Sequence, residues 1–232
     1  MLSSIKNSIP KIHQEGYFFI IIFLIVTFAF FIFSKILGFF GLFLTIWCVF
    51  FFRDPDRVTP EQDNIIISPA DGVVQKIEEA KLPKEIANDK NITHRISIFL
   101  NVFNVHVNRI PVTGIIKKLH YNHGKFFNAS FNKASEYNER QSVLLELKNS
   151  SQIGLVQIAG LIARRIICNL KESQYVSIGQ RFGIIKFGSR VDVYLPTHFK
   201  IKVLEGQTIV GGETIIAELK SDSNIKKYDN KC

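Results

Sequence analysis

The feature that most constrains the fold is a pair of uncharged apolar runs near the N-terminus. Residues 16–33 read GYFFIIIFLIVTFAFFIF and residues 36–52 read ILGFFGLFLTIWCVFFF, with only Ser34 and Lys35 between them. Each run approaches the roughly 17 to 25 residues that a helix needs to cross a bilayer. The short connection predicts a membrane hairpin of two hydrophobic helices within residues 1–52, with both ends on the same side of the membrane.

Charges at the ends of these runs predict the orientation of the hairpin. Lys6, Lys11, Arg53 and Arg57 flank the outer ends, against a single Lys35 at the turn. Because positive residues concentrate on the cytoplasmic side, we expect the inner cell membrane, with the rest of the chain on its cytoplasmic face. A re-entrant or interfacial hairpin gives the same pattern, so crossing the bilayer and lying in it both stay open. A signal peptide fits less well, because its apolar core usually spans about 7 to 15 residues and ends at a small-residue cleavage site.

The composition narrows the classes of partner. The net charge of +9 is spread along the chain with acidic residues between the basic ones. Nucleic-acid binding favours a concentrated basic stripe, so we expect no nucleic-acid partner. A basic protein at a membrane instead suits anionic lipid headgroups, whose attraction is worth about 1 kcal/mol per well-placed Lys or Arg. Cys48, Cys168 and Cys232 have no short spacing, so we expect no metal site, no disulfide framework and a reducing compartment.

Beyond a polar linker with two prolines at residues 53–64, the chain is typical of short strands. Residues 65–220 consist of β-branched runs broken by Gly, Asn, Ser or Pro, and none of them sustains the helical period of 3.6. We predict a mainly β, compact antiparallel domain here, followed by a polar tail at residues 221–232. The turns in SPADGVVQKI and IKVLEGQTIVGGETIIAEL resemble those of lipoyl or biotinyl carrier domains. A membrane-tethered carrier or adaptor without catalysis is therefore the alternative, although its lysine beside a methionine is missing, since Met1 is the only methionine.

Three residues could together form a catalytic group. They are Asp71 in SPADG, His106 in FLNVFNVHVNRIP and Ser189, which follows Gly188 in KFGSR. Alternation over residues 99–108 predicts one strand with His106 on its polar face. A hydroxyl, a base and an orienting carboxylate suffice for nucleophilic chemistry, but the sequence does not show that they meet. Gly188 and Ser189 equally suit a hairpin turn, and the Gly-x-Ser-x-Gly elbow of many serine hydrolases is missing.

Several motifs occur in the order found in a known family. They are FFRDPDRVTP, ISPADGVV, IFLNVFNVHVNRIPVTG, NKASEYNER and FGSRVDVYLP. Through them the chain resembles phosphatidylserine decarboxylases of the short, membrane-anchored form over nearly all of residues 50–220. The resemblance implies a zymogen in which Ser189 Oγ attacks the Gly188 carbonyl, and elimination from the resulting ester leaves a pyruvoyl group in place of Ser189. The fragments 1–188 and 189–232 are expected to stay associated, because both contribute strands to one fold.

The resemblance also implies the reaction and the roles of individual residues. The pyruvoyl carbonyl would form a Schiff base with the amino group of phosphatidylserine, and loss of carbon dioxide would yield phosphatidylethanolamine, a step of phospholipid biosynthesis. His106, oriented by Asp71, is expected to act as the base in self-cleavage and as the proton donor in decarboxylation. Its reference pKa of about 6.5 suits both directions of proton transfer. Asn138, Glu139 and Arg140 are expected to position the headgroup.

The sequence departs from the better-known pattern of this family at two places. Many members have Leu-Gly-Ser-Thr where this chain has Phe-Gly-Ser-Arg, and the role of Arg190 has no explanation from sequence. Many members also carry a second histidine where this chain has Arg109. Whether His106 serves both steps therefore stays open, as do a homo-oligomer and the selectivity for the headgroup. The other histidines that could take one step are His120, His123 and His198.

Overall fold

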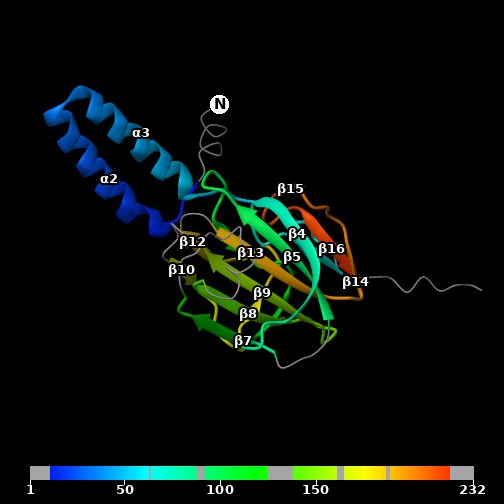
Figure 1. The fold of residues 1–232 in the computed structure, drawn as a ribbon. Helices are drawn as coiled ribbons and strands as arrows, with labels where there is room; N and C mark the ends of the chain where they lie inside the picture. The colour runs from blue at the N-terminus through cyan, green and yellow to red at the C-terminus, as the bar shows by residue number, and fades with distance from the viewer. Residues whose placement is uncertain are drawn as a thin grey trace, which may run out of the picture.

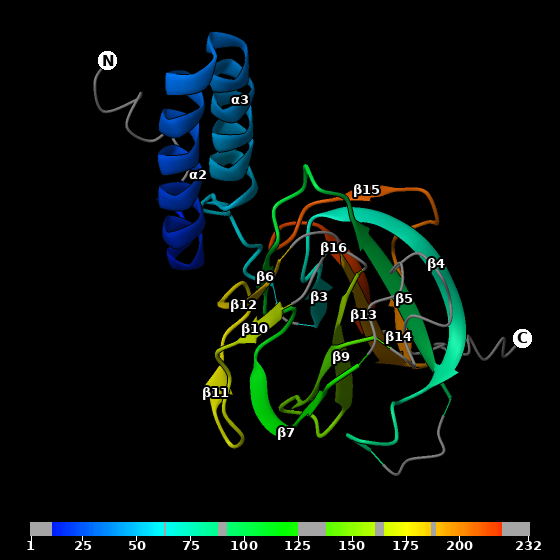
Figure 2. The same ribbon diagram turned by 60° about the vertical axis from the view of Figure 1, so that its left-hand side comes forward.

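Two helices project from a domain of curled sheets in the computed structural model (Figures 1 and 2). The structure describes residues 11–62, 64–87, 92–124, 138–160, 165–186 and 189–219. The predicted polar tail and Gly188 lie outside the described residues. Helix α2 is Gln14–Phe33, and helix α3 is Lys35–Phe51. They begin one or two residues before the apolar runs; at α2 the His13 side chain caps the helix by accepting the Glu15 N–H at 3.3 Å.

The two helices pack against each other through small and hydroxylated residues. The hydroxyls of Thr27 and Thr45 lie 2.9 Å apart, and Thr45 also donates to the Gly41 carbonyl at 3.0 Å. A Cβ on Gly41 would lie 2.9 Å from the Thr27 hydroxyl, so the glycine permits the close approach. Such contacts are typical of helix pairs in membranes. By length and apolar composition α2 is able to cross a membrane, whereas α3 is shorter.

The outer surface of the helix pair is apolar and uncovered. Its exposed large side chains include Phe18, Ile21, Ile25, Phe28, Ile32, Ile36, Phe39, Phe40, Phe43 and Ile46. Soluble monomers rarely leave so large a patch in water, and lipid is the solvent that suits it. The hairpin therefore indicates association with a membrane.

One antiparallel sheet of eight strands dominates the β-domain. Its order is β11-β7-β8-β9-β13-β5-β4-β15. The strands are β4 (Gly72–Lys81), β5 (Ile92–Leu100), β7 (Gly114–Asn122), β8 (Arg140–Glu146), β9 (Gln152–Ala159), β11 (Tyr175–Val176), β13 (Ser189–Pro196) and β15 (Thr208–Ile209). The prediction of a mainly β, antiparallel fold preceded by a hydrophobic helix is confirmed. The likeness of its turns to those of carrier domains stays a prediction.

Smaller sheets complete the domain. They have the orders β10-β12-β6, β14-β16-β3 and β1-β2. Their strands are β1 (Lys11–Ile12), β2 (Arg53–Asp54), β3 (Ile65–Ile67), β6 (Val107–Arg109), β10 (Arg165–Cys168), β12 (Arg181–Lys186), β14 (Phe199–Ile201) and β16 (Ile215–Leu219). The start of the predicted linker thus pairs with the residues just before α2, and Asp54 also forms an ion pair with Arg181 at 2.7 Å. The base of the hairpin is in this way fixed to the β-domain.

The two faces of strand β13 bury different kinds of residue. Val191, Val193 and Leu195 belong to the main hydrophobic core. Since side chains alternate along a strand, Ser189 lies on this core-facing side, and the even-numbered residues lie on the other. On that other face Tyr194 packs in a smaller cluster with Leu82, Ile86, Leu144, Val156 and Ile158.

The prediction of one continuous strand over residues 99–108 is wrong. Strand β5 ends at Leu100, and β6 joins a different sheet. Asn101 accepts the Phe103 N–H at 2.8 Å, and Asn104 accepts the Asn101 N–H at 2.9 Å. Asparagine side chains that bond neighbouring backbone in this way form turns, and here they override the alternating pattern.

The hairpin-turn interpretation of Gly188 and Ser189 also fails. Strand β12 pairs with β10 and β6, whereas β13 pairs with β9 and β5. The chain therefore passes from a small sheet to the large one just before Ser189.

Candidate active site

Ser189 is the first residue of β13 and lies between two strands. Its backbone is in register with Leu100 of β5 on one side and with Ala159 of β9 on the other. The side chain is fully buried, and its hydroxyl has no hydrogen-bond partner among the described residues. Leaving a buried polar group unpaired costs about 1–3 kcal/mol. Such groups call for an explanation, and a reactive role is one.

His106 is fully buried, which the sequence did not indicate. Its Nδ1 lies 3.0 Å from the Asn104 carbonyl oxygen. Because a carbonyl only accepts, Nδ1 carries the proton, and Nε2 presents a lone pair that has no partner in the described part of the chain. Burial lowers the pKa of His106 to about 4, the Asn104 hydrogen bond opposes this shift, and the charge of Arg53 adds to it. The imidazole is therefore neutral near pH 7 and is ready to accept a proton.

The base of the helix hairpin covers His106. The Phe51 ring at the end of α3 lies 4.2 Å from the imidazole, measured between ring centroids. Arg53 donates to the Phe103 carbonyl at 2.7 Å, which fixes the turn that precedes His106. The apolar cluster at this joint consists of Cys48, Phe51, Phe52, Val105, Val107 and Ile184. The candidate base therefore lies where the hairpin meets the β-domain.

A partly buried ion pair connects the helix hairpin to the β-domain close to Ser189 in sequence. Lys186, the last residue of β12, contacts the Glu15 carboxylate of α2 at 2.8 Å. The lysine is buried, so water screens this pair less than a surface pair. The start of α2 is thereby held beside the segment that leads to Ser189.

Asp71 has other partners in this structure. Its carboxylate oxygens lie 2.8 and 3.1 Å from Arg57 Nη2, and Oδ1 accepts the Gly211 N–H at 2.8 Å. Burial lowers the pKa of Arg53, and the charge of Asp71 opposes this shift. The charge of Arg53 in turn contributes to the lowered pKa of His106. The hydrogen bonds of Asp71 among the described residues go to Arg57 and Gly211, and direct orientation of His106 by Asp71 stays a prediction.

The candidate site also includes a pair of buried amide side chains that the sequence analysis did not identify. Gln157 of β9 donates from Nε2 to Asn108 Oδ1 of β6 at 2.7 Å. Both side chains are fully buried, and Asn108 Nδ2 and Gln157 Oε1 have no partner in the described ranges. The position of Asn108 two residues after His106 was a weak signal, whereas nothing in the sequence distinguishes Gln157.

Asn138, Glu139 and Arg140 make contacts within the protein. Asn138 Nδ2 donates to the Ala159 carbonyl at 2.8 Å, next to the rung that holds Ser189. The other two contacts are from Tyr121 OH to Glu139 Oε1 at 2.7 Å and from Arg140 Nε to Glu85 Oε1 at 2.9 Å. Their predicted role in headgroup binding stays a prediction.

Arg190 now has a structural explanation. It points to the face of β13 opposite Ser189 and forms a buried ion pair with Asp192, with Nε to Oδ1 and Nη2 to Oδ2 both at 2.9 Å. Because the two residues are two apart on one strand, the pair stiffens the start of β13. Arg190 thus supports the strand on which Ser189 lies.

The other histidines named from sequence lie elsewhere. His120 and His123 are exposed, and His123 packs edge-on against Tyr121. His198 contacts the Ser151 hydroxyl at 3.1 Å, in the turn beyond the far end of β9. Unlike these three, His106 is fully buried.

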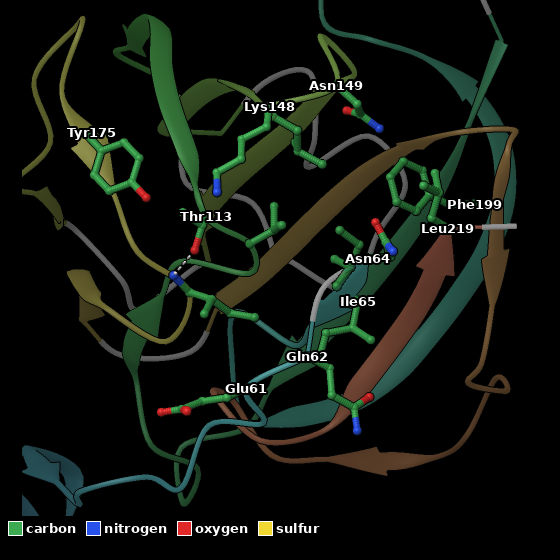
Figure 3. A pocket seen from close by; sticks show the side chains of 14 residues that line it. Glu61, Gln62, Asn64, Ile65, Thr113, Lys148, Asn149, Tyr175, Phe199 and Leu219 are labelled. Carbon is green, nitrogen blue, oxygen red and sulfur yellow. Dashed lines mark hydrogen bonds between the residues drawn. The ribbon is translucent and has the colours of Figure 1, made fainter. Parts of the chain in front are cut away.

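A cavity of about 730 Å³ opens at the end of the large sheet that lies away from Ser189 (Figure 3). It is bordered by the β8–β9 turn at Leu147–Asn149, by Tyr175 and by Phe199. The turn lies about 25 Å along β9 from the rung of Ser189, at about 3.3 Å per residue. None of the candidate catalytic residues lines this cavity.

Comparisons with known proteins agree on one family. The family model described as phosphatidylserine decarboxylase matches residues 44–217. The chain is similar to the phosphatidylserine decarboxylase proenzyme of Rickettsia typhi, with 58% identity over 207 residues that cover 89% of this chain and 90% of the relative. The proenzyme of Rickettsia bellii gives the same values. That of Rickettsia peacockii is 55% identical over 221 residues, covering 95% and 96% of the two chains.

Proposed function

Since the chain belongs to the phosphatidylserine decarboxylase family, we propose that buried Ser189 and His106 generate and use the reactive group of this enzyme. The activity is that of a carboxy-lyase, which converts phosphatidylserine to phosphatidylethanolamine. The relatives carry the name proenzyme, which implies a precursor that is processed. The observation that carries the proposal is the unpartnered Ser189 hydroxyl, buried at the start of a strand that is paired on both sides.

The first step is cleavage of the peptide bond between Gly188 and Ser189. Ser189 Oγ bonds to the Gly188 carbonyl carbon, the C–N bond breaks, and His106 Nε2 takes the hydroxyl proton for delivery to the freed amine. Elimination then releases the Gly188 carboxylate and leaves dehydroalanine, whose hydrolysis gives ammonia and a pyruvoyl group. The neutral imidazole with an open Nε2 supports this role.

The structure supports continued association of the two fragments. Strand β13 belongs to the fragment 189–232, whereas its neighbours β5 and β9 belong to the fragment 1–188. The register with β5 runs from Ser189 to Pro196. The backbone hydrogen bonds on both sides of β13 do not depend on the broken peptide bond.

The residues present fit a pyruvoyl group at position 189. When formed, it supplies a carbonyl for the headgroup amine and an electron sink for the departing carbon dioxide. The Ser189 hydroxyl forms no hydrogen bond with a lysine or arginine in the described part of the chain. A headgroup carboxylate near His106 raises the pKa of the imidazole, because an opposite charge favours the protonated form. Substrate binding would thus prepare His106 to donate a proton to the carbon that has lost carbon dioxide.

The joint between hairpin and β-domain supports a site at the membrane surface. The uncovered apolar surface of α2 and α3 enters the lipid, and their ends at Glu15 and Phe51 lie against Lys186 and His106. We propose the inner membrane, with the β-domain on the cytoplasmic face. A lipid headgroup then meets the site without leaving the bilayer.

A serine substitution tests the proposed function. Ser189→Ala removes the nucleophile, so membranes containing this variant should form no phosphatidylethanolamine and should show one chain on a denaturing gel. The matched control is Ser97→Ala, a buried serine on neighbouring β5 in register with Asp192 rather than with Ser189. It should keep two chains and activity. Activity of the Ser189→Ala protein, or an unbroken wild-type chain in an active preparation, would overturn the mechanism. An unbroken wild-type chain without activity would favour the carrier-like alternative.

A further inference from the structure

We propose that the amide pair Asn108–Gln157 recognises the amino-acid end of the substrate headgroup. Asn108 Nδ2 donates to the headgroup carboxylate, and Gln157 Oε1 accepts from the N–H of the headgroup nitrogen. This inference rests on the proposed function and deepens it, because it assigns selectivity for a serine headgroup to two residues of the chain.

The sheet register places the pair next to Ser189. On β9, Ala159 is opposite Ser189 and Gln157 is opposite Val191, so Gln157 is the diagonal neighbour of Ser189 on the same face. Diagonal neighbours are about 7–8 Å apart, within reach of a long side chain. Asn108 reaches Gln157 from β6 of the small sheet. The pair therefore bridges two sheets beside the nucleophile.

The pair offers one donor and one acceptor that the described protein does not use. Each amide spends one polar atom on the other, and Asn108 Nδ2 and Gln157 Oε1 stay unpaired although both residues are fully buried. Each unpaired group costs about 1–3 kcal/mol. A pair that only connected the sheets would be equally served by apolar side chains, which carry no such cost. The open atoms match a ligand with an acceptor and a donor side by side, as in an α-amino acid.

Neutral amides also suit the reaction better than a cation. A buried Arg or Lys would stabilise the carboxylate that the reaction must lose, and stronger binding of the ground state than of the transition state slows the chemical step. A single neutral amide donor orients the carboxylate without the Coulomb attraction of a full positive charge, so it stabilises the bound carboxylate less.

The same arrangement discriminates substrate from product. Phosphatidylethanolamine has the amine but lacks the carboxylate, so it leaves Asn108 Nδ2 unpaired. Sites that hydrogen-bond a ligand group reject analogues without it, because their own polar group is then buried without a partner. Asn108 therefore favours phosphatidylserine over the product, while Gln157 serves both.

Lipid binding to enzyme inactivated by borohydride tests the assignment of the amide pair. Borohydride reduces the pyruvoyl ketone of the processed enzyme to an alcohol, so short-chain lipids bind without reacting and calorimetry reports their affinity. Asn108→Ala should weaken the binding of dihexanoyl phosphatidylserine by roughly tenfold, about 1.4 kcal/mol. It should leave the affinity for the ethanolamine lipid unchanged. Gln157→Ala should weaken the binding of both lipids. Thr93→Val, which removes a buried hydroxyl bonded to the Ala80 carbonyl, is the matched control and should change neither.

A second variant, together with a check for the chain break, distinguishes failure of this inference from failure of the proposed function. Asn108→Asp keeps the size and replaces the donor by an acidic group, so it should favour the ethanolamine lipid even if the alanine variant folds poorly. Equal losses for both lipids in Asn108→Ala and no change of preference in Asn108→Asp would overturn the inference. If wild type itself showed no chain break and no mass gain on reduction, the proposed function would fail instead.

Discussion

At the scale of single residues, the burial of His106, which has no negatively charged partner among the described residues, explains its chemistry. Its Nδ1 proton is held by the Asn104 carbonyl, which leaves Nε2 as the acceptor. Burial lowers its pKa to about 4, below the ordinary value of 6.5. The neutral form is thus favoured in the folded protein, and it is lost only as the pH falls through the lowered pKa.

This predicts a flat pH profile for self-cleavage. Precursor made by cell-free synthesis and shifted to buffers between pH 8 and pH 6 should cleave at one rate, because His106 stays neutral throughout. A base with the ordinary pKa of 6.5 would lose about three quarters of its neutral form over this range. Densitometry of the two chains on a denaturing gel gives the rate. A fourfold slowing from pH 8 to pH 6 would contradict the assigned pKa.

Individual residues differ in how far the sequence could predict them. Ser189 and His106 stand in recognisable motifs, and both lie buried with an unpaired polar atom. The Asn108–Gln157 contact could not be predicted, because the two residues are 49 positions apart in the chain and belong to strands of different sheets. Arg190 was unexplained until the strand showed which face carries its side chain.

At the scale of elements, helix α3 has a second role beside its place in the hairpin. Its last residue, Phe51, covers the His106 ring, and Arg53 just beyond it fixes the turn at Phe103. The helix end therefore keeps water from the imidazole, which is what lowers the pKa.

Truncating Phe51 tests this role of the helix. In Phe51→Ala, water reaches His106, its pKa rises toward 6.5, and self-cleavage should become slower at pH 6 than at pH 8. The matched control is Phe43→Ala on the same helix, whose ring is exposed on the apolar surface and touches none of the site residues discussed above. Its profile should stay flat, like that of wild type. An unchanged profile in Phe51→Ala would show that the helix does not set the pKa.

Helices and strands could be predicted from sequence where one physical property, such as hydrophobic length, decides the structure. The apolar runs specify both helices to within two residues, since hydrophobic length decides a hairpin of this kind. Alternation failed between β5 and β6, because the side chains of Asn101 and Asn104 bond the local backbone and turn the chain. Local hydrogen bonds of this kind compete with strand pairing and are not visible in the hydrophobic pattern.

At the scale of the whole molecule, the hairpin and the β-domain form one working unit. Composition and apolar patterning were sufficient for the fold class and for the hydrophobic helices. The order of the large sheet was not predictable, because β13 pairs with strands far away in sequence on both sides. That order matters for function, since it holds the fragment after the cleavage point between strands of the fragment before it.

The mass of the fragment that begins at residue 189 tests the central claim most directly. The protein is purified from membranes, its chains are separated under denaturing conditions, and each is measured by mass spectrometry. We predict a fragment 189–232 lighter by one ammonia than the same peptide with an N-terminal serine, and heavier by two hydrogens after borohydride reduction. A fragment with a free serine end, or an active protein in which the chain is unbroken, would contradict the account.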